Sequence, residues 1–129
     1  MSEITVDRLG RPVVRVEIPG GESFLAHIDT GFNGEMMLAE FDARRLGFTI
    51  ATKAANVTVA GDVVQRVMEG SGTIHWFGEA RRVELYVSTA TPSKRMDDGP
   101  VALIGKRLLI PHLLLVDFAR GTVEIETQE

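Results

Sequence analysis

Cysteine is absent from the 129 residues of this chain. Its absence excludes disulfide bonds, thiol nucleophiles and zinc–thiolate centres, because each of these needs a cysteine sulfur. A chain without cysteine is compatible with a reducing compartment. We therefore expect a cytoplasmic protein whose fold is held by packing and hydrogen bonds rather than by covalent cross-links.

The sequence also lacks a long apolar run and a concentration of positive charge. The longest apolar candidate, residues 108–116, is interrupted by Pro111 and His112 and is shorter than the roughly 20 residues that span a bilayer. The first ten residues are polar and do not resemble a signal peptide. The formal net charge is -4, and the densest basic pairs, Arg44-Arg45 and Arg81-Arg82, are interpreted as solvated surface positions. We expect no membrane and no nucleic-acid partner.

The composition that remains is typical of an ordinary globular domain. Hydrophobic residues make up 44% of the chain and charged residues 25%. A length of 129 residues fits one domain with its own core and leaves no room for a second full lobe. We predict a single domain over residues 1–129, with a core between residues 12 and 126.

Short apolar runs separated by turn residues dominate the pattern. Residues 12–18 alternate apolar and polar side chains, Pro19-Gly20-Gly21 is typical of a turn, and residues 23–28 resume an extended run, which predicts a β-hairpin. Residues 113–125 predict a closing hairpin. Residues 56–88 are rich in Val, Thr and Ile, which favours strands. The glycines that interrupt this segment are interpreted as tight turns: Gly61, Gly70, Gly72 and Gly78.

Helical composition is confined to two short stretches. Residues 40–46 fit a short helix, with Gly47 at the position of a C-cap. Residues 106–110 fit one helical turn, after an apolar run over residues 101–104 that predicts a buried strand. Many short strands and few helices predict an all-β fold (mostly β with one or two short helices), arranged as a closed or sandwich-like β domain.

An acidic residue, Asp29, ends the apolar run that begins at Phe24. A carboxylate beside a core costs desolvation energy unless it is hydrogen-bonded or paired. Thr30 offers a hydroxyl for such a bond, and Gly31 allows the backbone to turn and present its N–H to the carboxylate. The tripeptide Asp29-Thr30-Gly31 alone is also typical of an everyday turn. It becomes a candidate catalytic motif only together with a second motif.

The second motif is Leu103-Ile104-Gly105, an apolar strand that ends in glycine and precedes a short helical segment. This ordered pair of motifs resembles the retropepsin-like (clan AA) aspartic proteases, and specifically their single-lobe prokaryotic branch. Residues 115–125 are also similar to the C-terminal hairpin of that family, so the resemblance covers residues 12–126. It implies a closed, β-barrel-like acid-protease lobe.

The resemblance implies a role for each residue of the two motifs. Asp29 would be the catalytic aspartate, Thr30 would brace the two active-site loops across a dimer, and Gly31 would hold the loop and donate to the carboxylate. The scaffold beside that loop would be formed by three residues: Leu103, Ile104 and Gly105.

The resemblance also implies a flap, a hairpin that closes over the substrate. Residues 57–66 are the first candidate. The tip of this flap would be formed by Ala60, Gly61 and Asp62. Gly70-Ser71-Gly72 is a second candidate for the flap.

Aspartic-protease chemistry needs two carboxyl groups that share one proton, because two close carboxylates cannot both ionise cheaply. The ionised member takes a proton from water while the neutral member donates to the scissile carbonyl. This chain has one Asp-Thr-Gly, so activity would require a homodimer. The prediction is an aspartic endopeptidase that acts on peptide or protein substrates, with water as the nucleophile and with no metal or other cofactor.

Phe32 departs from the family, in which alanine or serine commonly follows the glycine. A large ring at this position would narrow the cleft or pack at the dimer interface. The alternative function is a catalytically inactive module of the same fold for dimerisation or peptide binding, in which Asp29 is retained for loop structure. A third hypothesis is a regulatory subunit of a stress or toxin–antitoxin operon.

Metal binding is disfavoured by the spacing of the candidate ligands. Four residues fit positions of a calcium loop: Asp29, Asn33, Gly34 and Glu40. Gly31 and Met37 occupy two further ligand positions of that loop without supplying a side-chain oxygen. The histidines have no i, i+4 pair among them: His27, His75 and His112. His27 shares a strand face with Asp29 and is interpreted as a surface or hydrogen-bonded core histidine, with tuning of Asp29 as the alternative.

Overall fold

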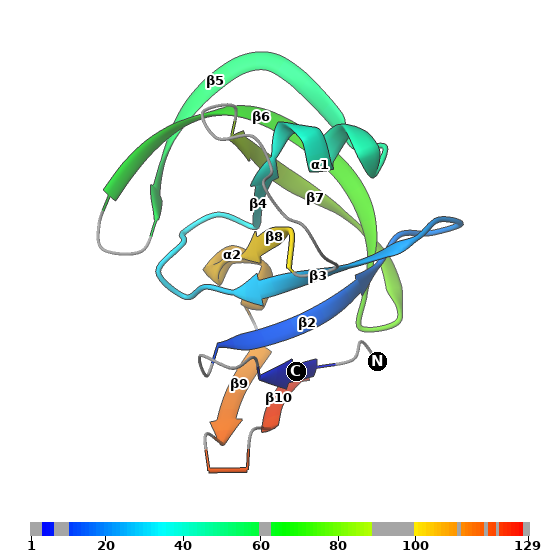
Figure 1. Ribbon diagram of the computed structural model, residues 1–129, viewed down its shortest axis with the longest axis vertical. Coiled ribbons are helices and arrows are strands. Elements are labelled where there is room, and N and C mark those ends of the chain that lie inside the picture. The colour runs from blue at the N-terminus through cyan, green and yellow to red at the C-terminus, as the bar shows by residue number, and fades with distance from the viewer. Residues whose placement is uncertain are drawn as a thin grey trace.

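The computed structural model describes residues 4–6, 11–59, 63–88, 100–110, 112–117, 119–120 and 122–127. Within these residues the chain is mostly β-strand with two short helices, which confirms the predicted all-β fold (Figure 1). In chain order the elements are β1 (Ile4–Val6), β2 (Pro12–Glu17), β3 (Ser23–Ile28), β4 (Met36–Ala39), α1 (Glu40–Arg45), β5 (Thr49–Val59), β6 (Val63–Trp76), β7 (Glu79–Ser88), β8 (Ala102–Ile104), α2 (Lys106–Leu109), β9 (His112–Asp117) and β10 (Thr122–Thr127).

Six of these strands close into a barrel, as predicted. The larger sheet has the order β1-β2-β3-β8-β4-β7-β6-β5, and a further pairing of β2 with β6, at Glu17 and His75, joins the ring. The long strand β6 sweeps across the molecule in Figure 1, so that one part of it pairs with β5 while its end reaches β2. Strands β9 and β10 form a separate two-stranded sheet. Closure leaves no open edge within the ring itself.

Both predicted hairpins form. Strands β2 and β3 pair antiparallel with Val14 opposite Ala26, and their turn passes through Gly20, whose φ of 70° lies in the left-handed region that favours glycine. Strands β9 and β10 pair antiparallel with Leu115 opposite Glu124. Strand β1 pairs with β2 and is a strand that the polar N-terminal sequence did not indicate.

The two helices also lie where the sequence predicts them. Gly47 follows α1 with a φ of 80°, and its N–H donates to Arg44 O, which ends the helix. Helix α2 is a single turn that begins directly after Gly105. Neither helix of the described chain is long and apolar enough to cross a membrane.

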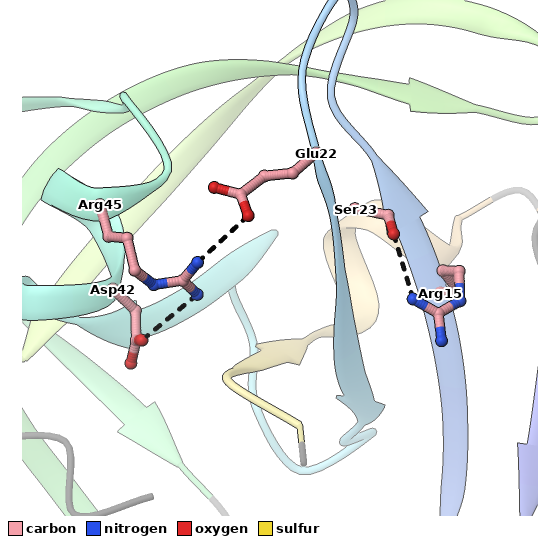
Figure 2. Close-up of polar contacts among 5 residues, drawn as sticks. All are labelled: Arg15, Glu22, Ser23, Asp42 and Arg45. Carbon is pink, nitrogen blue, oxygen red and sulfur yellow. Dashed lines mark hydrogen bonds and ion pairs between the residues drawn. The ribbon is translucent and has the colours of Figure 1, made fainter. Parts of the chain in front are cut away.

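Arg45 of α1 forms one ion pair with the turn between β2 and β3 and a second within the helix (Figure 2). Arg45 Nη1 lies 3.4 Å from Glu22 Oε2, and Arg45 Nη2 lies 3.7 Å from Asp42 Oδ1. Asp42 is only 2% exposed, so the arginine brings a positive charge to a carboxylate that lies in the core. On the neighbouring strands Arg15 Nη1 donates to Ser23 Oγ at 3.1 Å.

The glycines within residues 56–88 do not all mark turns, which corrects the prediction. Gly70 and Gly72 lie inside β6, a continuous strand of 14 residues. A Cβ at Gly70 would lie 2.5 Å from Thr49 O, and a Cβ at Gly72 would overlap the ring of Phe48. These glycines therefore allow close packing of neighbouring groups rather than a change of direction. The second flap candidate, Gly70-Ser71-Gly72, is wrong for this reason.

Two clusters of buried apolar side chains fill the fold. The larger cluster includes Val14, Val16, Phe24, Ala26, Ile74, Leu85, Val87 and Ile104. The smaller consists of Phe32, Met37, Val57 and Val67, with Ala55, Tyr86 and Leu103 packed against it, and we call it the Phe32 cluster. It joins the segment after β3 to β4, β5 and β6. It therefore helps to decide where the loop that contains Asp29 lies.

Candidate active site

Asp29 directly follows β3 and lies beside the end of β8. The two strands are parallel, with His27 opposite Leu103 and Ile28 opposite Ile104. The pairing continues for one more step, because the Asp29 N–H donates to Ile104 O at 2.8 Å. The barrel thus brings together two motifs that are far apart in the sequence, Asp29-Thr30-Gly31 and Leu103-Ile104-Gly105.

The carboxylate of Asp29 is held by the turn that it begins. Gly31 N–H donates to Asp29 Oδ1 at 2.9 Å, and Phe32 N–H donates to Asp29 O at 3.1 Å. The first of these bonds is the contact that the sequence predicts for Gly31. Asp29 is partly exposed, and Thr30 and Gly31 are exposed. The arrangement therefore orients an aspartate at the surface of the loop. The predicted contact of the Thr30 hydroxyl across a dimer stays a prediction.

Carbonyl groups of the loop after Asp29 accept hydrogen bonds from the segment that starts α2. Gly105 N–H donates to Glu35 O at 3.0 Å, Lys106 N–H to Phe32 O at 3.0 Å, and Arg107 N–H to Gly34 O at 3.2 Å. The first N–H groups of a helix have no partner within the helix, and α2 has no side-chain cap. The loop supplies the missing acceptors, so the loop and the helix start fix one another.

Gly105 has no room for a side chain. A Cβ at this position would lie 2.6 Å from both Phe32 O and Phe32 Cδ2, and closer still to Gly34 O. The glycine lets the β8–α2 junction lie directly against the Asp29 loop. This is the physical reason for a glycine at the end of the second motif.

Phe32 lies neither in a cleft nor at an interface between copies, and both expectations for its ring are wrong. The side chain is fully buried in this chain and belongs to the Phe32 cluster, with Val57 and Val67 among its partners. The ring of Tyr86 meets it edge to face, with 6.1 Å between ring centroids. The inward position of the Phe32 ring was not predictable from the sequence, because side chains of its cluster come from the distant strands β5, β6 and β7.

Glu35 is a second residue of the site that the sequence did not single out. Its carboxylate accepts hydrogen bonds from Arg81 Nη2 at 2.7 Å and from the Glu84 N–H at 2.7 Å. The side chain of Glu35 is 12% exposed. The pair ties the end of the Asp29 loop to β7, so Arg81 is more than the solvated position that the sequence suggested. Glu35 and Arg81 lie far apart in the sequence, and ion pairs between distant segments have no characteristic spacing. The sequence therefore held no pattern that identifies this pair.

The first flap candidate corresponds to the hairpin of β5 and β6. The last described pair of this hairpin is Val59 with Val63, and the predicted tip, Ala60, Gly61 and Asp62, lies outside the described residues. In Figure 1 the last part of β5 and the first part of β6 lie on the same side of the molecule as the segment between β3 and β4. Val57 and Val67 belong to the same cluster as Phe32, which agrees with this placement.

Metal binding finds no support among the side chains that the structure describes. No three of their His, Asp and Glu residues lie close enough together to hold a metal ion. Glu40, which the calcium-loop pattern would need as a ligand, instead pairs with Arg44 within α1 at 2.8 Å.

Comparison with known proteins adds no relative. A scan against protein-family models, a search of curated proteins and a search of solved structures each find no match for this chain. The resemblance to retropepsin-like aspartic proteases therefore rests on the two motifs of the sequence and stays a prediction.

Proposed function

We propose that this chain is an aspartic endopeptidase that acts as a homodimer on peptide or protein substrates. The observation that carries the proposal is the bond between the Asp29 N–H and Ile104 O, which seats a partly exposed aspartate against the Ile104-Gly105 segment. Asp29 would act as one of two carboxyl groups, and its orientation by the Gly31 N–H supports that role.

The second carboxyl group of the proposed pair is the Asp29 of another copy. Glu35, the other acid of the loop segment, binds Arg81 and the Glu84 N–H and is largely buried, so it is already engaged. An aspartic dyad needs a neutral member and an ionised member at one place. Two copies related by a two-fold axis would supply two equivalent aspartates.

In the proposed mechanism the two Asp29 carboxyl groups share one proton. The ionised carboxylate takes a proton from a water molecule, whose oxygen attacks the scissile carbonyl carbon. The protonated carboxyl group donates its proton to the carbonyl oxygen, which gives a neutral tetrahedral intermediate. The carboxyl group that took the proton from water then donates it to the amide nitrogen, while the other carboxylate takes a proton from a hydroxyl group of the intermediate. The C–N bond breaks, and the products are a carboxylic acid and an amine. These steps need no cofactor, and a cytoplasmic location for them stays part of the proposal.

A second candidate function is a module of the same fold that binds peptides or dimerises without cleaving. The bond from the Gly31 N–H to Asp29 Oδ1 favours it, because an aspartate that only stabilises its own turn makes the same contact. Asp117 shows this in the same chain, where its Oδ1 accepts from the Arg120 N–H at 3.1 Å.

Cleavage of an unfolded protein, assayed from acid to neutral pH, separates the two candidates. We expect Asp29→Asn to lower the cleavage rate by about 10²-fold or more, because it removes a group that transfers protons. Asp117→Asn is the matched control, since it makes the same change in another turn aspartate, and it should leave the rate unchanged. Equal rates for wild type and Asp29→Asn would exclude the peptidase and leave the binding module.

A further inference from the structure

The ring of Phe32 fills a space that separate parts of the chain leave for it. A Cβ at Gly34 would lie 2.7 Å from Phe32 Cζ, and a Cβ at Gly105 would lie 2.6 Å from Phe32 Cδ2. The ring belongs to the same cluster of buried apolar side chains as Val57 of β5 and Val67 of β6. Two glycines thus lie against one aromatic ring, which is fully buried and shares its cluster with two hairpin side chains.

The backbone of Phe32 connects this ring to Asp29. The Phe32 N–H donates to Asp29 O at 3.1 Å, and Phe32 O accepts from the Lys106 N–H at 3.0 Å. Thr30 and Gly31, the residues between, are exposed. The packing that anchors the turn therefore comes from Phe32, and a displacement of the ring would move the peptide group that carries the bond to Asp29.

We propose that Phe32 is a positioning residue that ties the orientation of the Asp29 carboxylate to the position of the β5–β6 hairpin. A close-packed core transmits small displacements, because its side chains have few empty spaces to move into. A shift of Val57 or Val67 is therefore passed to the ring and from the ring to the Asp29 turn. A molecule that moves the hairpin would change the geometry of the aspartate inside the same chain.

This inference rests on the proposed function only in treating Asp29 as the reacting group. The coupling itself does not require cleavage, and it can be measured in a chain that cleaves nothing. The Gly31 amide is a direct reporter, because its hydrogen atom lies in the bond to Asp29 Oδ1. Its proton chemical shift and its rate of exchange with water both depend on the geometry of that bond.

The test compares three variants by nuclear magnetic resonance of the Gly31 amide. Phe32→Leu replaces the ring with a smaller side chain, and Val57→Ala removes part of the Phe32 cluster on the hairpin without changing the loop. Val16→Ala is the matched control, because Val16 is equally buried but belongs to the larger cluster and pairs with Phe24 at the far end of β3. Phe24 is separated from Asp29 by five residue steps, about 17 Å of extended strand.

We expect the Gly31 amide to exchange several-fold faster, and its proton shift to move, in Phe32→Leu and in Val57→Ala but not in Val16→Ala. If the wild type cleaves peptides, Phe32→Leu should also lower kcat with little change in KM. Gly31 signals that are the same in Val57→Ala and Val16→Ala would overturn the coupling. That result would leave the peptidase proposal intact, whereas loss of the peptidase proposal would leave the Gly31 comparison valid. If Phe32→Leu does not fold, Val57→Ala alone decides.

Discussion

At the scale of single residues, Gly105 shows why the second motif ends in glycine. A methyl group there would meet Phe32 O and Phe32 Cδ2 at 2.6 Å. Backbone oxygen atoms cannot move aside as the end of a flexible side chain can. The motif is therefore needed for packing of the Asp29 loop, whatever chemistry the loop performs.

We predict that Gly105→Ala lowers the free energy of unfolding by about 1–3 kcal/mol, the usual cost of forcing a group into a filled core. Urea unfolding followed by circular dichroism measures this loss. Gly21→Ala is the control, because a Cβ at Gly21 has its nearest contact at 3.4 Å, with Ile18 Cγ2. A loss in Gly105→Ala no larger than in Gly21→Ala would contradict the close packing described for the Asp29 loop.

Glu35 stabilises the same loop through charge. Its carboxylate lies 2.7 Å from Arg81 Nη2 and is mostly shielded from water. We predict that Glu35→Gln costs about 1–3 kcal/mol of unfolding free energy, because Arg81 loses a charged acceptor. Glu40→Gln removes an exposed i, i+4 pair with Arg44 and should cost about 0.3–0.5 kcal/mol. Thermal and urea unfolding of the two variants under the same buffer would reveal the difference, and equal losses would contradict it.

At the scale of elements, the sequence predicted local structure well. The turn at Gly20, the end of α1 at Gly47 and the strand before Gly105 follow from neighbours in the chain. It did not predict that Gly70 lies within a strand, because the reason is the carbonyl of Thr49 on β5. The inward position of Phe32 has the same kind of cause, since Val57, Val67 and Tyr86 come from other elements. Pairings between distant segments are what a single sequence leaves undetermined.

The elements also differ in expected stability. Strand β6 lies between β5 and β7 and is paired on both sides, whereas β9 and β10 pair only with each other in the described chain. A two-stranded hairpin is marginally stable alone, and the packing of Ile125 into the larger cluster adds to its stability without adding a strand pairing. We predict faster amide hydrogen exchange in β9 and β10 than in residues 68–71 of β6, measured by mass spectrometry or nuclear magnetic resonance. Equal protection would mean that the two sheets unfold as one unit.

At the scale of the whole molecule, the closed barrel presents one candidate aspartate per chain. The ring of six strands places Asp29 beside Ile104, and the loop is held by hydrogen bonds from α2 and by the buried ring of Phe32. The proposed chemistry needs two such loops. The central claim is therefore that activity belongs to a pair of chains, each of which contributes its Asp29.

Mixing wild-type chains with Asp29→Asn chains tests this claim most directly. The wild-type concentration is held constant, the subunits are allowed to exchange, and cleavage is measured as the variant is added. If each active dimer needs two aspartates, activity per wild-type chain falls to about one half at equal amounts, because half of the wild-type chains then sit in mixed dimers. Asp117→Asn chains added in the same amounts should cause no such loss. Activity per wild-type chain that stays constant as Asp29→Asn chains are added would contradict the account.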